Sequence, residues 1–107
     1  KYRYAIEQLS AVTGRAFTTL HVLGGGTKDR LLCQMTADCC SLTVKAGPVE
    51  ATALGNIMIQ LKALGLLDSI TQGRRLIAET EVIKTYTPST QNDAEWNAAY
   101  DRFKTLL

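Results

Sequence analysis

The sequence predicts an α/β fold that is mostly helical and has two recognisable strands. Residues 16–23 and 42–45 are short apolar runs that contain β-branched residues. Gly24 directly follows the first run and Gly47 follows the second after one residue, as expected of a strand that enters a turn. The segments around these runs repeat apolar residues at steps of three and four, which is the spacing of a helix. Strands that alternate with helices usually lie parallel to one another in one sheet.

A first helix is predicted at the start of the chain. Tyr2, Ile6 and Leu9 fall on one helical face, and Gly14 can end the helix in the left-handed conformation that glycine adopts most easily. The chain does not begin with methionine, and Lys1 already lies inside the helical pattern. We therefore expect this sequence to be a piece of a longer protein.

A second helix is predicted between the two strands. Thr27 or Asp29 can cap its start, because a short polar side chain there accepts a hydrogen bond from a free backbone N–H group. Leu31, Met35 and Cys39 then share one helical stripe.

Two more helices are predicted after the second strand. The longer one covers residues 49–64, with Gly65 as its stop. The shorter one opens at Asp68 or Ser69, either of which can cap it, and Gly73 is expected to break or weaken it. The apolar side of the longer helix comprises Ala51, Leu54, Met58 and Leu61.

The last part of the chain is predicted to be extended or looped over residues 79–91 and helical afterwards. Pro88 disfavours a helical conformation at the residue before it. The final helix starts near Asn92 or Asp93 and places three aromatic side chains on one side, those of Trp96, Tyr100 and Phe103.

The predicted sheet is incomplete. Two strands make a marginal sheet, and parallel strands normally have both faces covered. We expect the missing neighbours to come from upstream or from a second copy of the chain. The chain is therefore expected to self-associate as a dimer or to recruit a partner through its unpaired sheet edges.

Composition and charge exclude several classes of protein. Hydrophobic residues make up 46% and charged residues 21% of the 107 residues, which is ordinary globular usage. A net charge of +2 without a basic cluster does not indicate binding to nucleic acid or to a membrane. No apolar run approaches the roughly 20 residues that cross a bilayer.

The cysteines indicate a reducing environment. Cys33, Cys39 and Cys40 are odd in number and clustered, unlike the dispersed pairs of a disulfide framework. No second ligand pair completes a zinc site, so no metal site is expected. We interpret the three residues as small buried thiols of a cytoplasmic protein.

The segment that can carry chemistry is the strand–glycine–helix junction at Gly24, Gly25 and Gly26. Glycine lets a backbone approach a nucleotide closely because no Cβ intervenes, and N–H groups at a helix start favour anions. The junction lacks the Gly-Lys-Ser/Thr of a P-loop and the spacing of a dinucleotide fold. These residues alone support either a tight turn or a site of phosphate or nucleotide approach.

Two longer motifs add a resemblance. Residues 20–40, LHVLGGGTKDRLLCQMTADCC, resemble the adenosine-binding motif in the C-terminal domain of the FGGY carbohydrate kinases. In that family a strand ends in two or three glycines, and a helix with a Leu-x-Gln…Ala-Asp pattern follows. Residues 47–60, GPVEATALGNIMIQ, are similar to the next part of the family's sequence, in the form typical of the branch that phosphorylates L-rhamnulose. The resemblance covers nearly the whole chain.

The resemblance implies that residues 1–107 are the C-terminal portion of an actin-like, ribonuclease-H-like ATPase domain, with the sugar-binding N-terminal domain absent. It implies ATP and Mg²⁺ as cofactors and transfer of the γ-phosphoryl group to the 1-hydroxyl of L-rhamnulose, the sugar being bound by the missing domain. In the family an aspartate early in the second domain accepts the hydroxyl proton. No aspartate of this chain matches its motif, so no catalytic residue is expected here.

For ATP binding the resemblance implies Gly25 foremost, with Gly24 and Gly26 shaping the same turn. Asp29 stands where many members have asparagine, whose amide can donate to adenine as well as accept from it. A carboxylate can only accept. Asn56 and Gln60 lie one helical turn apart and form either a polar patch near the cleft or ordinary helix surface.

Three further expectations concern local structure. Asp38 is expected to make structural contacts, and Glu50 to be an acceptor at a helix start. Ser41 stands where glycine is usual in the family, which predicts a slightly different turn. Two alternative functions stay open: another FGGY sugar or polyol kinase, and a non-catalytic actin-like module that binds nucleotide or partners.

Overall fold

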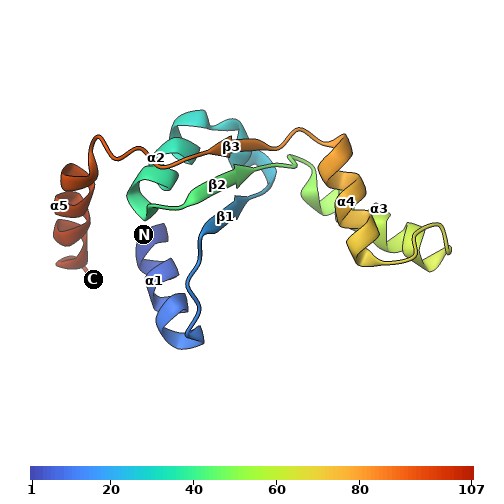
Figure 1. Ribbon diagram of the computed structural model, residues 1–107, viewed down its shortest axis with the longest axis horizontal. Coiled ribbons are helices and arrows are strands. Elements are labelled where there is room, and N and C mark those ends of the chain that lie inside the picture. The colour runs from blue at the N-terminus through green and yellow to red at the C-terminus, as the bar shows by residue number, and fades with distance from the viewer.

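The computed structural model describes all residues 1–107 and shows five α-helices, one 3₁₀ helix and a three-stranded sheet (Figure 1). Along the chain the elements are α1 (Tyr2–Thr13), β1 (Thr19–Val22), the 3₁₀ helix η1 (Gly24–Lys28), α2 (Arg30–Cys40), β2 (Thr43–Ala46), α3 (Ala51–Ala63), α4 (Ile70–Thr80), β3 (Lys84–Tyr86) and α5 (Asp93–Lys104). The predicted α/β class is confirmed.

The sheet has the order β1-β2-β3. β1 and β2 are parallel, as predicted, and α2 connects them, whereas β3 pairs antiparallel with the other edge of β2. The expectation of only two strands is therefore wrong. β3 has three residues, and Lys84 and Thr85 are polar, so no apolar pattern marks it in the sequence. It forms because its backbone pairs with β2.

One face of the sheet carries the core. Val44 and Ala46 of β2 pack against Cys33 and Ala37 of α2, and all four side chains are buried. Alternate residues of a strand point to opposite faces. Lys45 lies between Val44 and Ala46 and pairs with His21 of β1. Both residues therefore lie on the other face of the sheet, where they are exposed.

The buried side of α2 differs from its predicted stripe. Leu31 and Met35 are 69% and 42% exposed. The residues that face the sheet are instead small, which lets the helix lie close to the strands: Cys33 and Ala37.

Helices α3 and α4 form a hairpin whose ends follow the predicted signals. Gly65 adopts a left-handed conformation just after α3, with φ of 72°. Ser69 caps α4 by accepting a hydrogen bond from the Gln72 N–H at 3.1 Å. The predicted apolar side of α3 is also its less exposed side, with Leu54 and Met58 half-buried.

Gly73 does not break α4, which corrects the sequence prediction. The helix continues through this position to Thr80, and Gly73 is buried. A Cβ at Gly73 would lie 2.5 Å from Met58 Cγ and Sδ in α3. Glycine is therefore needed here for the close approach of two helices, and the contacts between α3 and α4 offset its low helix propensity.

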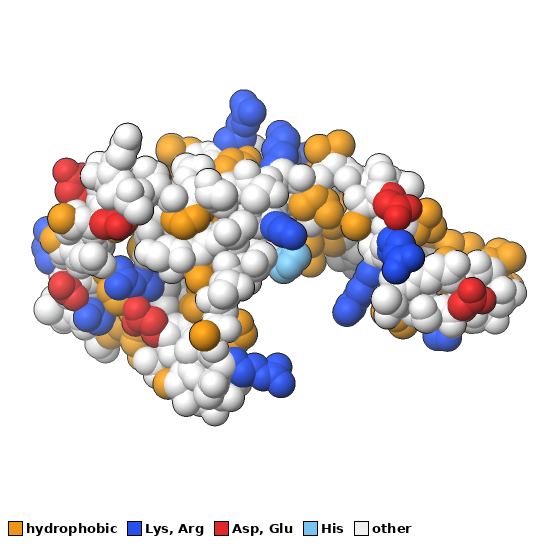
Figure 2. All heavy atoms as spheres, in the orientation of Figure 1, with side chains coloured by type: hydrophobic (Ala, Val, Ile, Leu, Met, Phe, Trp, Pro, Cys, Tyr) orange, Lys and Arg blue, Asp and Glu red, His pale blue; other side chains and the backbone are white.

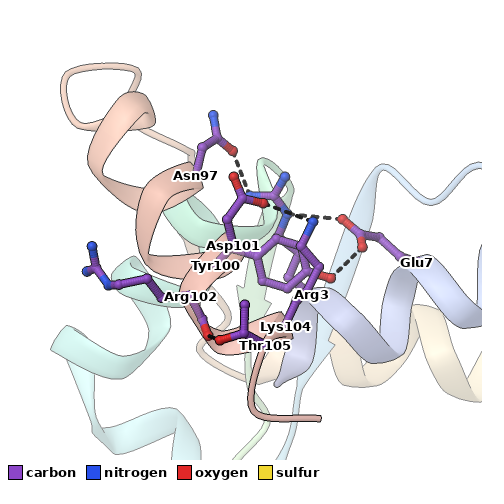
Figure 3. Close-up of polar contacts among 8 residues, drawn as sticks. All are labelled: Arg3, Glu7, Asn97, Tyr100, Asp101, Arg102, Lys104 and Thr105. Carbon is purple, nitrogen blue, oxygen red and sulfur yellow. Dashed lines mark hydrogen bonds and ion pairs between the residues drawn. The ribbon is translucent and has the colours of Figure 1, made fainter.

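The first and last helices are joined by polar contacts among Arg3, Glu7, Asn97 and Tyr100, here called the α1–α5 clasp (Figure 3). Arg3 donates to Glu7 Oε1 at 3.1 Å and to Asn97 Oδ1 at 2.8 Å, and its guanidinium lies 4.3 Å from the centre of the Tyr100 ring. The Tyr100 hydroxyl donates to Glu7. This hydrogen bond lowers the pKa of Glu7 and raises the pKa of Tyr100 to about 12.

The molecule is extended rather than compact. Its radius of gyration is 16.8 Å, above the ~13 Å expected of a compact domain of this size. The α3–α4 hairpin projects at one end and α5 lies at the other (Figure 1). Hydrophobic side chains are exposed along the hairpin (Figure 2), among them Ile59, Leu64 and Leu66. None of the helices combines the length and the apolar character needed to span a membrane.

Candidate functional site

The glycine turn, defined here as Gly24 to Gly26, lies at the carboxyl end of β1 and opens η1. Gly24 adopts a left-handed conformation with φ of 75°, which glycine adopts at little cost. Its N–H donates to the Pro48 carbonyl at 3.2 Å, and its carbonyl accepts from the Thr27 hydroxyl at 2.7 Å. The turn is thus fixed to the segment that follows β2.

A thiol supports the far end of the turn. Cys33, buried in α2, donates its S–H to the Gly26 carbonyl over 3.8 Å. Burial raises the pKa of the Cys33 thiol, with the Asp29 carboxylate acting in the same direction. The thiol therefore keeps the proton that it donates. Cys39 and Cys40 are half-buried rather than fully buried, and none of the three cysteines is in a disulfide.

Open space lies above the middle of the turn. A Cβ at Gly25 would have no atom within 4 Å, and the residue is exposed. A Cβ at Gly26 would instead lie 3.8 Å from Val22 Cγ1. A flat ligand can therefore approach the backbone at Gly25 without displacing any part of the chain, which is the geometry that a nucleotide site on this turn requires.

Asp29 caps α2, as predicted. Its Oδ1 accepts a hydrogen bond from the Leu32 N–H at 2.9 Å, and a negative charge at a helix start is favoured by the helix dipole. The side chain of Asp29 is therefore engaged in the cap of α2.

The Gln34–Asp38 pair of the motif has a structural task, which confirms the expectation for Asp38. Gln34 Nε2 donates to Asp38 Oδ1 at 2.8 Å and to the Thr87 carbonyl at 2.9 Å. The same Asp38 oxygen accepts from the Ser89 N–H at 2.8 Å. These contacts hold the segment after β3 against α2, and thereby keep β3 in the sheet.

Other predicted residues do not gather at the turn. Asn56 and Gln60 are both exposed on α3 and share no hydrogen bond. The expectation for Glu50 is wrong, because its side chain accepts no capping bond at the start of α3. Ser41 adopts the left-handed conformation, with φ of 52°, that a glycine there would adopt with less strain.

Two lysines near the turn were not identified from the sequence. Lys28 at the end of η1 and Lys84 in β3 line a cavity next to the turn. In the sequence, only its position after the glycines indicates that Lys28 lies near the turn. Lys84 lies there because β3 pairs with β2, and no local sequence pattern predicts that pairing. Nowhere in the chain do three or more His, Cys, Asp or Glu side chains gather to hold a metal ion.

A larger cavity lies elsewhere. It measures about 610 Å³ and opens between α1 and the end of α2, with Arg15, Phe17 and Cys40 among its lining residues. Burial raises the pKa of the Cys40 thiol to about 11, so this thiol is not a nucleophile at neutral pH. Arg3 and Glu7, which also line it, are already bound to each other in the clasp. The glycine turn is therefore the better candidate site.

Comparison with known proteins identifies the family. The sequence profile of the C-terminal domain of the FGGY family of carbohydrate kinases matches residues 1–64. The chain belongs to this family. The FGGY resemblance of the motifs at residues 20–40 and 47–60 is thereby confirmed, and the α/β arrangement of five helices and three strands is consistent with an actin-like ATPase domain.

Individual relatives are similar along most of the chain. A rhamnulokinase of Bacteroides thetaiotaomicron is 45% identical over all 107 residues, which cover 22% of that relative. Rhamnulokinases of an Enterobacter species and of Klebsiella pneumoniae are 42% and 38% identical over 87 and 92 residues, or 18% and 19% of their own lengths. The chain thus spans about a fifth of the curated relatives that it matches.

Proposed function

We propose that the chain is the C-terminal portion of an ATP-dependent carbohydrate kinase that phosphorylates L-rhamnulose at its 1-hydroxyl, and that the glycine turn contributes to its ATP site. The observation that supports this proposal most is the 45% identity to a rhamnulokinase over the whole chain. The open approach to the Gly25 backbone agrees with it.

In this proposal the chain positions the nucleotide and performs no proton transfer. Phosphoryl transfer depends on the placement of the phosphates, on Mg²⁺ to neutralise their charge, and on a carboxylate that accepts the hydroxyl proton. The exposed turn at Gly25 provides a surface for the nucleotide. The Asp38 carboxylate is engaged in structural hydrogen bonds, so we assign the proton acceptor to a part of the kinase outside this chain.

The test is nucleotide binding by the chain, together with a kinase assay. Isothermal titration calorimetry is expected to show binding of Mg-ATP to the 107-residue chain. The same chain, mixed with ATP and L-rhamnulose, is expected to form no rhamnulose 1-phosphate. Turnover by the pure chain would contradict this division of labour, and the absence of nucleotide binding would contradict the assignment of the site.

A related sugar or polyol kinase is the closest alternative, because the residues that select the sugar lie outside this chain in the proposal. A panel of ketoses and polyols offered to the longer protein separates the two.

A non-catalytic actin-like module is the other alternative. It predicts that the longer protein binds ATP but phosphorylates none of the sugars.

We further propose that the isolated chain dimerises. One edge of β1 has no neighbouring strand, and the α3–α4 hairpin leaves large apolar side chains in solvent, with Leu64 73% and Leu66 67% exposed. Such surfaces favour association. Analytical ultracentrifugation at micromolar concentration is expected to show a dimer, and a stable monomer would contradict the proposal.

The unpaired thiols support one last part of the proposal, a cytoplasmic location. Cys39 and Cys40 are adjacent in α2 and are not fully buried, so an oxidising compartment would expose them to oxidation. Fractionation of cells that express the longer protein tests this location.

A further inference from the structure

The cavity between α1 and the end of α2, here called the α1–α2 cavity, lies next to the residues that precede β1, whereas the glycine turn follows the end of β1. Its volume is about 610 Å³. Small-molecule sites typically have volumes of about 300–1,000 Å³. No residue of the glycine turn lines the cavity, so it is separate from the proposed nucleotide site.

The cavity continues into a smaller apolar pocket. This pocket measures about 140 Å³, and Ile6, Phe17 and Leu42 line both spaces. The other residues that line the pocket are Leu9, Thr19 and Leu20. A hydrocarbon group placed there would leave water for an apolar surface, which is favourable. The pocket is therefore suited to the apolar part of a ligand.

The polar part of the cavity carries an unbalanced positive charge. Arg3 and Glu7 both line it, but they are paired with each other at 3.1 Å. The other ion pair of the chain is Lys104–Asp101, so Arg15 has no carboxylate partner. Arg15 also lines the cavity and is exposed. Its guanidinium is therefore free to bind an anion, and a carboxylate can accept two parallel N–H bonds from it.

Ser41 adds a hydroxyl group to the wall of the cavity. Its backbone N–H donates to the Asp38 carbonyl at 3.3 Å, and the hydroxyl takes no part in this bond. Ser41 holds a left-handed conformation, with φ of 52°, which costs free energy for any residue other than glycine. A ligand contact through the hydroxyl gives a reason for serine at a position where glycine would be less strained.

We propose that the α1–α2 cavity binds a small carboxylate that has an apolar chain. The apolar chain occupies the pocket at Leu9 and Leu20, and the carboxylate binds Arg15, with the Ser41 hydroxyl as a second donor. The inference goes beyond the proposed function and does not depend on it, because no residue of the glycine turn takes part.

The test uses octanoate as the probe, with octanol and acetate as comparison ligands. Octanol lacks the charge, and acetate lacks the apolar chain. Calorimetry measures the affinity of each ligand for the 107-residue chain, and amide chemical shifts in NMR spectra locate the bound octanoate. The same affinities are measured for Arg15→Gln, Ser41→Gly and Leu9→Gln, and circular dichroism verifies that each variant is folded. Arg74→Gln is the matched control, because Arg74 is an exposed arginine of α4 that lines neither space.

Octanoate is expected to bind about tenfold more tightly than octanol or acetate, because only octanoate fills both parts of the site. Arg15→Gln is expected to weaken octanoate binding about fivefold and octanol binding less than about twofold. Ser41→Gly is expected to weaken octanoate binding about threefold, because one donor is lost. Leu9→Gln is expected to weaken octanoate and octanol to the same extent, and Arg74→Gln is expected to change neither.

Several results would overturn the inference. If octanol binds as tightly as octanoate, or if Arg15→Gln retains the wild-type affinity, Arg15 does not bind a carboxylate. If Ser41→Gly binds octanoate as the wild type does, the reason given for the strained serine is wrong. Chemical shift changes outside the two spaces would place octanoate elsewhere.

Two further results separate this site from other parts of the protein. If octanoate binds the 107-residue chain but not the longer protein, another part of that protein occupies the cavity, and the inference fails. Competition between octanoate and ATP would assign both ligands to one site and would also overturn it. None of these results tests whether the glycine turn binds ATP, so failure of the inference is distinguishable from failure of the proposed function.

Discussion

The substitution Gly25→Ala separates a ligand site from a mere turn. A Cβ at this position would have no atom within 4 Å, and Gly25 is not among the residues with a left-handed conformation. Alanine therefore fits the folded chain without strain. Replacing glycine by alanine at such a position stabilises a protein by ~0.4–1 kcal/mol, because the unfolded chain loses conformational freedom.

The same methyl group would interfere with a nucleotide. Carbon atoms in contact lie ~3.5–4.0 Å apart, and a Cβ extends ~1.5 Å from the backbone, so a ligand that contacts the Gly25 backbone must move by ~1 Å. A gap of ~0.5–1 Å already forfeits a quarter to a half of the dispersion energy of each contact. Over the many contacts of a nucleotide we expect a loss of ~1.4 kcal/mol or more, which is at least a tenfold weaker ATP affinity.

The assay combines calorimetry of ATP binding with urea denaturation. Gly55→Ala is the matched control, because a Cβ at Gly55 would also have no atom within 4 Å, while Gly55 lies in α3 and outside the glycine turn. The control is expected to change ATP affinity less than about twofold. If Gly25→Ala is as stable as the wild type and binds ATP equally well, the assignment of the turn as a nucleotide site is refuted.

The remaining predictions concern stability. Ser41→Gly is expected to raise the free energy of unfolding by about 1 kcal/mol, because glycine adopts the left-handed conformation of this position without strain; urea denaturation checks this, and an unchanged midpoint would contradict it. Gly73→Ala is expected to cost ~1–3 kcal/mol in the same assay through overlap with Met58, and a neutral result would show that the helices separate easily. The hydrogen bond to Glu7 raises the pKa of Tyr100 from 10 to about 12. The contribution of this bond to the free energy of unfolding is therefore complete below pH 10 and is lost as the pH rises toward 12. In Tyr100→Phe, the free energy of unfolding is expected to fall less between pH 10 and 12 than in the wild type. If it depends on pH in the same way in both proteins, the clasp does not contribute to stability.

Local signals in the sequence located most elements. Gly14 and Gly65 adopt the left-handed conformations expected after a helix, and Asp29 and Ser69 are caps whose side chains accept backbone hydrogen bonds. These features depend on residues close together in the sequence, so a single chain is enough to predict them.

Features that depend on distant parts of the chain were not predictable in this way. β3 exists because β2 offers an edge to Lys84–Tyr86, and Gly73 suits a helix only because Met58 lies against it. The α1–α5 clasp joins Glu7 to Tyr100, at opposite ends of the sequence. For the candidate site, the glycines and the Asp29 cap followed from the sequence, whereas the place of Lys84 depends on a strand that the sequence did not reveal.

In the proposed function, this chain supplies the ATP-binding part of a kinase that phosphorylates L-rhamnulose. The most direct measurement uses a chimera in which the chain replaces the matched segment of the Bacteroides thetaiotaomicron rhamnulokinase, to which it is 45% identical over its whole length. ATP-dependent formation of rhamnulose 1-phosphate is measured for the chimera and for the chimera with Gly25→Ala. We predict phosphoryl transfer by the first protein and a rate lower by about 10²-fold in the second, because a displacement of ~1 Å in a reacting ligand has effects of this size. A folded chimera that binds the sugar but transfers no phosphate from ATP would contradict the claim.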